Sequence, residues 1–216
     1  MKMKIYVELT QEDYDTICFL NRLAYFDLKY PEPFNKVATV SKLDGLRMNV
    51  FDMGHYTLVI CCGTNDLRDW ITNFKVALGI EPHQYWSAYD YVVQEVYLKD
   101  REKPIVMSGH SLGGGIAEHV SSTIWCQCIT FNGCGCKHLI PYYHRDDFEC
   151  INVVTKHDIL NGITRRIPFA KKYMQHNGEV YIVDDKSWFP LSVKSHSDFG
   201  SMGNFDFSKT KTKKMG

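Results

Sequence analysis

The chain has 216 residues, of which 44% are apolar types and 23% are charged. These fractions are ordinary for a globular protein, and they exclude collagen-like, coiled-coil and wholly disordered classes. Basic and acidic residues number 25 each, so no overall charge attracts nucleic acid, and no nucleic-acid partner is expected. The length favours a single domain, which we place at residues 1–207, and the lysine-rich segment 208–216 is typical of a flexible basic tail.

Nothing in the sequence indicates membrane insertion or export. The longest apolar run, Leu58–Cys62, is much shorter than the about 20 residues that a membrane-spanning helix needs. Glu8 and Glu12 interrupt the stretch where the apolar part of a signal peptide would lie. Eight cysteines are too few for a disulfide scaffold. We therefore expect an intracellular, cytoplasmic protein with free thiols, in which the tail lysines are suited to peripheral contact with phospholipid headgroups.

The N-terminal part of the chain predicts a helix, a hairpin and a buried strand. Thr10-Gln-Glu-Asp13 has the form of a capping box, so a helix is expected to begin there. The helix should continue to the prolines at 31 and 33, because apolar residues recur on one helical face: Tyr14, Ile17, Cys18, Tyr25 and Leu28. Residues 37–53 alternate apolar and polar types around Asp44-Gly45, as a β-hairpin does. The continuous apolar run Tyr56–Cys62 is typical of a strand buried on both faces of a parallel sheet.

Strands and helices alternate over the rest of the chain. Helices are expected at residues 67–78 and over the apolar stripe between Tyr85 and Val96. Pro104–Met107 predicts a strand that leads into a helix at Ser111–Ser122. Further short strands are predicted at Cys126–Phe131, Cys150–Thr155 and Val180–Val183. This alternation predicts an α/β fold with a mostly parallel central sheet, helices on both faces, and a ligand site at the carboxyl edge of the strands.

A serine between the strand Pro104–Met107 and its helix is the strongest chemical signal. Gly109-His110-Ser111-Leu112-Gly113 matches the G-x-S-x-G nucleophile elbow, in the strand-to-helix context that the motif requires. The glycines let the strained turn approach the neighbouring strand and helix. The turn presents the serine oxygen beside the start of the helix, where the Leu112 amide and the helix dipole favour negative charge. Ser111 is therefore the candidate nucleophile, and Leu112 supplies half of an oxyanion hole.

Two segments resemble one known family. GHSLGGG at 109–115 and the upstream CGTNDLRDWITNF at 62–74 are similar to motifs of the class 3 (fungal-type) lipases of the α/β-hydrolase superfamily, and ITFNGCG at 129–135 resembles that family's next strand and glycine turn. The resemblance implies a compact α/β-hydrolase fold and a serine esterase that acts on a lipid or another small ester without a cofactor. It also implies that Thr64 is the second oxyanion donor, facing Leu112. Cys62 stands where the family usually has an arginine.

A serine hydrolase also needs a histidine and a carboxylate, because a free hydroxyl is a poor nucleophile. In α/β-hydrolases the chain order is serine, acid, histidine, so both partners are expected to follow Ser111. Asp158 lies just past the predicted strand Cys150–Thr155, in a segment similar to the acid loop of the lipase family. Asp184 and Asp185 follow another predicted strand and remain competing candidates for the acid.

His196 is the candidate base. It follows the last predicted strand, so a late loop would carry it back over the edge of the sheet. Four other histidines beyond the serine are discounted, because they lie on the helix after the serine or before or beside the acid: His119, His138, His144 and His157. His176 is expected in a turn before a strand. Ser111, Asp158 and His196 therefore make up the predicted catalytic triad.

The sequence thus predicts a carboxylic ester hydrolase of the lipase, phospholipase or esterase kind that works through an acyl-enzyme. Because only about residues 77–85 are available for a lid, we expect little or no lid and an open or lightly covered site. No metal is expected, since the C-x-C pairs Cys126-Gln-Cys128 and Cys134-Gly-Cys136 lack the usual spacing of zinc ligands. The alternative is a hydrolase-fold protein that has lost turnover and serves as a binding module.

Overall fold

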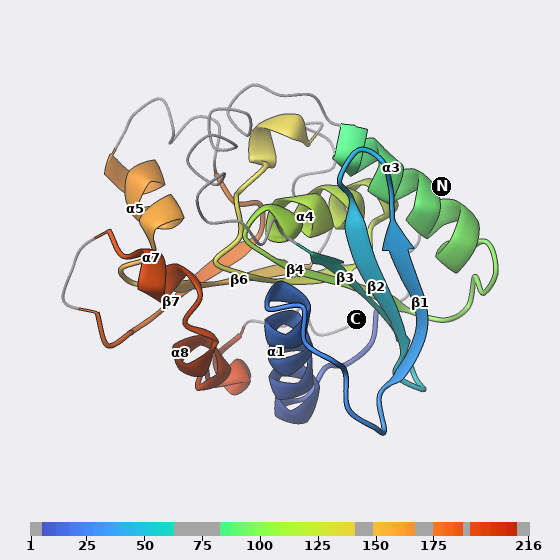
Figure 1. Cartoon of the computed structure of the whole chain (residues 1–216), viewed down its shortest axis with the longest axis horizontal. Helices are drawn as coiled ribbons and strands as arrows, with labels where there is room; N and C mark the ends of the chain where they lie inside the picture. Colours follow the sequence, from blue (N-terminus) through green and yellow to red (C-terminus); the bar gives the residue numbers. More distant parts are fainter. Residues whose placement is uncertain (1–5, 63–82, 141–148, 167–174, 188–190, 211–216) are drawn as a thin grey trace.

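The computed structural model describes residues 6–62, 83–140, 149–166, 175–187 and 191–210, which form one sheet with helices against it (Figure 1). The strands are β1 (Asn35–Ser41), β2 (Arg47–Asp52), β3 (Thr57–Cys62), β4 (Ile105–His110), β5 (Gln127–Phe131), β6 (Cys150–Thr155) and β7 (Glu179–Val183). The α-helices are α1 (Gln11–Tyr25), α3 (His83–Tyr91), α4 (Leu112–Ile124), α5 (Ile159–Arg166), α7 (Val193–His196) and α8 (Phe199–Gly203). A π-helix covers Val92–Tyr97, and 3₁₀ helices cover Lys137–Leu139 and Phe207–Lys209.

The strands lie in the sheet in the order in which they follow one another in the chain. β1, β2 and β3 are antiparallel to one another in turn, whereas β3 to β7 run parallel. The predicted hairpin and the mostly parallel sheet are therefore confirmed. β3 was expected in a parallel sheet, and it has one parallel neighbour, β4, and one antiparallel neighbour, β2 of the hairpin. Its residues 58–61 are buried, as the continuous apolar run predicted.

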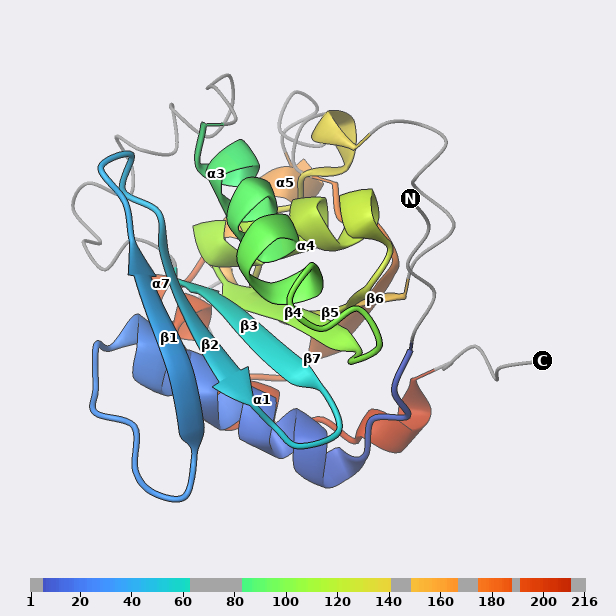
Figure 2. The same ribbon diagram turned by 90° about the vertical axis from the view of Figure 1, so that its right-hand side faces the viewer.

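Helices cover both faces of the sheet, which confirms the predicted layers. α1 and α8 lie on one face and α3 and α4 on the other, as two perpendicular views show (Figure 1, Figure 2). On the α4 side, Met107, Ile116 and Val120 are buried in one apolar cluster. On the α1 side, Tyr14 and Phe131 are fully buried in a second cluster. The removal of these side chains from water is the main term that holds the three layers together.

Helix α1 begins as predicted but ends earlier. The Thr10 hydroxyl accepts from the Asp13 amide at 3.2 Å, and the Asp13 carboxylate accepts from the Thr10 amide at 2.9 Å, which is the predicted capping box. The helix ends at Tyr25, and Asp27 then adopts a left-handed φ of 53° that turns the chain away. Leu28 is 49% exposed, so the expectation that it continues the buried helical face is wrong.

The C-terminal part of the described chain packs against the first helix. The Tyr14 hydroxyl donates to the Met202 carbonyl at 2.5 Å, and the Gln11 side chain bonds both the Phe205 carbonyl and the Phe207 amide. Regular structure therefore continues up to the predicted start of the tail at residue 208.

Two predicted segments fall partly or wholly outside the described residues. The tail was expected at 208–216, yet the short helix Phe207–Lys209 includes its first residues, and 211–216 lie outside the described ranges. The helix expected at 67–78 also lies outside them. Within the described ranges, no helix is long and apolar enough to cross a bilayer.

Candidate active site

Ser111 lies on the turn between β4 and α4, where the sequence predicted a nucleophile elbow. Its backbone has φ 57° and ψ −127°, a strained conformation for a residue with a side chain. The Ser111 carbonyl accepts from the amides of Gly114 at 3.0 Å and Cys134 at 2.9 Å. These bonds tie the turn both to its own helix and to the segment after β5, so the strain is held by the surrounding backbone.

Two glycines allow this turn to form. A β-carbon added at Gly109 would lie 2.2 Å from the Gly113 carbonyl oxygen, and one at Gly114 would lie 2.7 Å from the α-carbon of Gly133. Both distances are far below a van der Waals contact, and both atoms met are backbone atoms that cannot rotate away. The glycine pattern of the motif is therefore explained by close contacts of β4 with α4 and of α4 with the turn after β5.

His196 and Asp158 form a buried pair. His196 is the last residue of α7, and its Nδ1 atom lies 2.6 Å from Asp158 Oδ2. The exposed fractions are 2% for His196 and 0% for Asp158. Because a carboxylate can only accept, Nδ1 carries the proton and Nε2 is left to act as a base. This is the histidine–acid contact that the predicted triad requires.

The other oxygen of Asp158 is held by the start of helix α5. Asp158 Oδ1 accepts from the Asn161 amide and from Asn161 Nδ2, both at 2.7 Å. The aspartate thereby caps α5 at the end where the helix dipole favours negative charge. Both carboxylate oxygens are therefore engaged, one with the helix and one with His196.

The backbone of His196 is fixed by two polar side chains at the carboxyl edge of the sheet. Its carbonyl accepts from His110 Nε2 at 2.6 Å and from Asn132 Nδ2 at 2.9 Å. Asn132 follows β5 with a left-handed φ of 43°, and its Oδ1 accepts from the Thr155 amide at 2.7 Å. Burial and the neighbouring His196 lower the pKa of His110 well below its usual value, so its ring is neutral. These contacts fix the place of the candidate base over the ends of β4, β5 and β6.

His196 lies in space next to the residue that precedes Ser111. The ring of His110, the residue before Ser111, lies 4.6 Å from that of His196. Ser111 and His196 are each 2% exposed, and the expectation of an open or lightly covered site stays a prediction. Residues 77–82, most of the segment considered for a lid, lie outside the described ranges.

One of the two predicted oxyanion donors is described. Leu112 is the first residue of α4, so its amide has no carbonyl partner within the helix and points out of the helix start. Thr64 lies outside the described residues. The last described residue before it, Cys62, ends β3, the strand that pairs with β4 beside Gly109.

The competing candidates have other partners. Asp185 Oδ1 lies 2.7 Å from His157 Nδ1, and Asp184 pairs with Lys156 at 3.2 Å. Neither carboxylate is the partner of His196 Nδ1, which is Asp158. His119 is buried on α4 against the rings of Tyr85 and Trp86, away from the turn. His144 lies outside the described residues.

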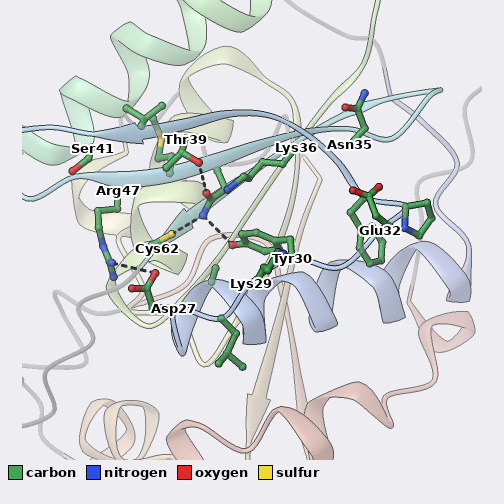
Figure 3. Close-up of a pocket in the computed structure, with 17 residues that line it drawn as sticks. Asp27, Lys29, Tyr30, Glu32, Asn35, Lys36, Thr39, Ser41, Arg47 and Cys62 are labelled. Atoms are coloured by element: carbon green, nitrogen blue, oxygen red, sulfur yellow. Dashed lines mark hydrogen bonds and ion pairs between the residues drawn. The ribbon is translucent and has the colours of Figure 1, made fainter.

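A cavity of about 570 Å³ adjoins the end of β3 (Figure 3). The segment after α1 forms one wall, and β1 and β2 form the other. Inside it, Asn49 Nδ2 donates to the Tyr30 hydroxyl at 3.0 Å and to Cys62 Sγ at 3.3 Å, and Arg47 lies 4.0 Å from Asp27 at the rim. Burial raises the pKa of the Cys62 thiol to about 11, so this cysteine stays protonated and is a poor nucleophile.

The remaining cysteines behave as core residues. All eight are free, and burial raises the pKa of Cys61, Cys126, Cys134 and Cys136 above the usual value. Among the residues that the structure describes, no group of three or more histidines, cysteines and acids is placed to hold a metal ion. Their burial explains the C-x-C pairs as packing.

Sequence reasoning missed several polar residues that support the site. His110 and Asn132 were noted only as members of sequence motifs, with no role assigned to either. The residues that hydrogen-bond to Asp158 were not predicted. Strand-end position was the available signal for His110 and Asn132, because polar side chains at the carboxyl ends of parallel strands meet at one edge. Asn161 follows the candidate acid by one helical turn, the spacing at which a capping acid meets a backbone amide.

Comparisons with known proteins agree with this geometry. Residues 34–141 match the family model of the Tle-like phospholipase domain. An extracellular phospholipase A1 of Serratia liquefaciens is 30% identical over 91 residues, a match that spans 42% of this chain and 28% of that protein.

Among solved structures, a fungal lipase–inhibitor complex superposes with a TM-score of 0.64 at 16% identity, covering 90% of this chain and 97% of that one. The Rhizomucor miehei lipase–propeptide complex gives 0.61 at 14% identity, with 94% and 84% covered. Lipase II of Rhizopus niveus gives 0.58 at 17% identity, with 84% and 82% covered. These likenesses show an α/β-hydrolase-like fold of the fungal lipase type. Because its family model matches half of the sequence, the chain belongs to the phospholipase-like family of Tle-like phospholipase domains.

Proposed function

We propose that the chain is a serine hydrolase that cleaves a carboxylic ester, with Ser111 as nucleophile, His196 as base and Asp158 as the acid that orients it. The observation that carries this proposal is the buried contact of 2.6 Å between His196 Nδ1 and Asp158 Oδ2. The ring of His196 also lies 4.6 Å from that of His110, the residue before a serine on a strained strand-to-helix turn. Family membership supports the same chemistry. The chain order serine, acid, histidine is also the order of α/β-hydrolases.

The reaction follows from the roles of these groups. Ser111 Oγ attacks the ester carbonyl carbon while His196 Nε2 takes the hydroxyl proton, and the imidazolium then gives that proton to the leaving alcohol. The Leu112 amide and, by resemblance, the Thr64 amide donate to the carbonyl oxygen as it becomes negative. Water, activated by the same imidazole, attacks the acyl-serine and releases the acid. The chain's own residues supply every proton transfer, so we propose no cofactor.

Phospholipids are the first substrates to test. The family is described as phospholipase-like, and the Serratia liquefaciens protein is described as a phospholipase A1. We infer that the scissile bond is an acyl ester of a glycerophospholipid or a related lipid. A short, water-dispersed ester serves as the reference substrate, because it needs the same chemistry without recognition of a headgroup.

Covalent labelling tests the proposal directly. A fluorophosphonate probe should modify the wild-type protein at Ser111, and Ser111→Ala should abolish labelling and lower kcat by up to about 10⁶-fold. Ser121→Ala is the matched control: Ser121 is buried on the same helix, and its hydroxyl bonds the Glu118 carbonyl of that helix at 3.0 Å. The control should label and turn over as the wild type does. A wild-type protein that takes no label would instead support a binding module without turnover.

A further inference from the structure

Behind Asp158, the described residues contain a line of buried polar side chains that the proposed chemistry does not use. Asn161 Oδ1 lies 2.9 Å from His176 Nε2, and His176 Nδ1 lies 3.4 Å from Glu118 Oε2. We call Asn161, His176 and Glu118 the support chain. It connects the candidate acid to helix α4, the helix that begins at the candidate nucleophile.

Burying these polar groups costs free energy unless each of them has a hydrogen-bond partner. Glu118 is 0% exposed, the His176 side chain 6% and Asn161 8%. The other carboxylate oxygen of Glu118 accepts a hydrogen bond from the Asn177 amide. Buried carboxylates and imidazoles are retained where hydrogen bonds satisfy them, and here each polar group faces a partner along the chain.

Hydrogen-bond chemistry fixes which group donates and which accepts at the link between Asn161 and His176. Asn161 Nδ2 donates to Asp158 Oδ1, so Asn161 Oδ1 faces the ring of His176. That oxygen can only accept, and therefore His176 must donate from Nε2. If His176 could not donate, the Asn161 amide would lose the contact that keeps its nitrogen toward Asp158. A flipped amide would put two acceptor oxygens against each other.

His176 is fixed independently of Asp158. Asn152 Nδ2 on β6 donates to the Asn177 carbonyl at 2.8 Å, and the Lys137 amide donates to the Gln175 carbonyl at 2.9 Å. A β-carbon at Gly178 would lie 2.3 Å from the Cys150 carbonyl oxygen, so this segment lies tightly against β6. The ring of His176 therefore presents its donor from a fixed backbone.

We propose that His176, held by Glu118, is a positioning residue for the candidate triad: it fixes the Asn161 amide, which in turn directs Asp158 toward His196. This inference rests on the proposed function, because its effect on rate passes through Asp158. His176 and Glu118 touch neither Ser111 nor His196 in the described contacts, and their action is on the geometry of the acid.

His176→Phe is the central test, with His119→Phe as its matched control. Phenylalanine fills a similar volume and removes the donor to Asn161. His119 is equally buried, at 3% exposed, and packs against aromatic rings without a bond to the triad. His176→Phe should lower kcat about 10- to 100-fold with KM within about twofold of the wild type, while His119→Phe leaves both unchanged.

Glu118→Gln tests whether Glu118 acts through its hydrogen bonds or through its negative charge. Glutamine can accept from the Asn177 amide and donate to His176 Nδ1, which keeps the proton on His176 Nε2. We expect kcat within about threefold of the wild type for this variant. A loss as large as that of His176→Phe would contradict positioning by hydrogen bonds.

A spectroscopic readout does not depend on turnover. The proton between His196 Nδ1 and Asp158 should give a low-field proton NMR signal, which His176→Phe should shift or broaden and His119→Phe should leave in place. Asn161→Ala should have the same effect on the signal and on kcat, and it keeps the proposal testable if His176→Phe does not fold. An unchanged signal and unchanged kcat in a folded His176→Phe or Asn161→Ala protein would overturn the inference. A wild-type protein that neither labels nor turns over would refute the proposed function, while the NMR comparison would still report on the support chain.

Discussion

The Asp158 carboxylate has two structural roles. One oxygen caps α5 through the Asn161 amide, and the other accepts from His196. The position of the acid is therefore set by a helix start and not by a free loop. A change at Asp158 should affect both the local helix and the chemistry, whereas a change at a competing aspartate should affect neither contact.

Asp158→Asn, compared with Asp185→Asn, should show which aspartate is the acid. The amide can still cap the helix through its oxygen, but it cannot orient His196 with a negative charge, so kcat should fall by about 10⁴-fold. Asp185→Asn, which alters the contact with His157, should keep kcat within about tenfold of the wild type. Steady-state hydrolysis of the short reference ester measures both. A larger loss in Asp185→Asn than in Asp158→Asn would reverse the assignment of the acid.

The residues of the proposed triad could be named from the sequence because each occupies a position that chain order defines. Ser111 follows a strand and precedes a helix, Asp158 follows a strand, and His196 follows the last strand. The supporting residues were not accessible in this way. His176 meets Asn161 only because the segment before β7, 15 residues further along the chain, lies against β6, and no local pattern in the sequence predicts that contact.

At the scale of elements, α4 lies in close contact with the turn after β5. The α-carbons of Gly114 and Gly133 approach so closely that a β-carbon at Gly114 would lie 2.7 Å from Gly133. This contact sets the distance of the helix start from the strand ends. The relative places of the Leu112 amide and the Asn132 side chain therefore depend on glycine at position 114.

Gly114→Ala should push α4 away from this turn. We expect a loss of about 1–3 kcal/mol in the free energy of unfolding, together with reduced kcat. Gly203→Ala is the matched control, because its added β-carbon would meet only Cys18 Sγ at 3.8 Å, an ordinary contact. Urea unfolding and ester hydrolysis of the two variants give the comparison. Equal stabilities would show that the backbone relaxes without cost.

Most elements could be predicted, and the errors have physical causes. The strand Cys150–Thr155 agrees residue for residue, because the segment is short, rich in β-branched residues and bounded by the charged Glu149 and Lys156. The helix α1 ends before its apolar pattern does, since Asp27 turns the chain through a left-handed conformation. The hairpin beside β3 was predicted, but its pairing with β3 depends on tertiary contacts that periodicity does not contain.

At the scale of the whole molecule, buried neutral histidines make stability depend on pH. Burial lowers the pKa of His119 to about 4, and burial with the neighbouring His196 lowers that of His110 well below its usual value. Below about pH 6.5 the unfolded chain binds protons at these rings that the native protein does not. The free energy of unfolding therefore decreases as the pH falls from about 6.5, and His119 adds no further decrease below about pH 4.

His119→Phe should flatten this dependence. Between pH 6.5 and 4.5 the His119 ring alone contributes a loss of about 2 to 3 kcal/mol, which the variant should lack. Urea denaturation midpoints of the wild type and the variant at both pH values measure the difference. The same change of stability with pH in both proteins would contradict a neutral His119 in the native state.

The packing of α1 against the last helices has a consequence for biosynthesis. Translation delivers the chain from its N-terminus, so β4 and its serine leave the ribosome long before residue 196. Until then α1 has no α8 to pack against, and Asp158 has no imidazole to orient. A partly made chain therefore lacks the histidine–acid pair, which can form only when translation of the described residues is almost finished.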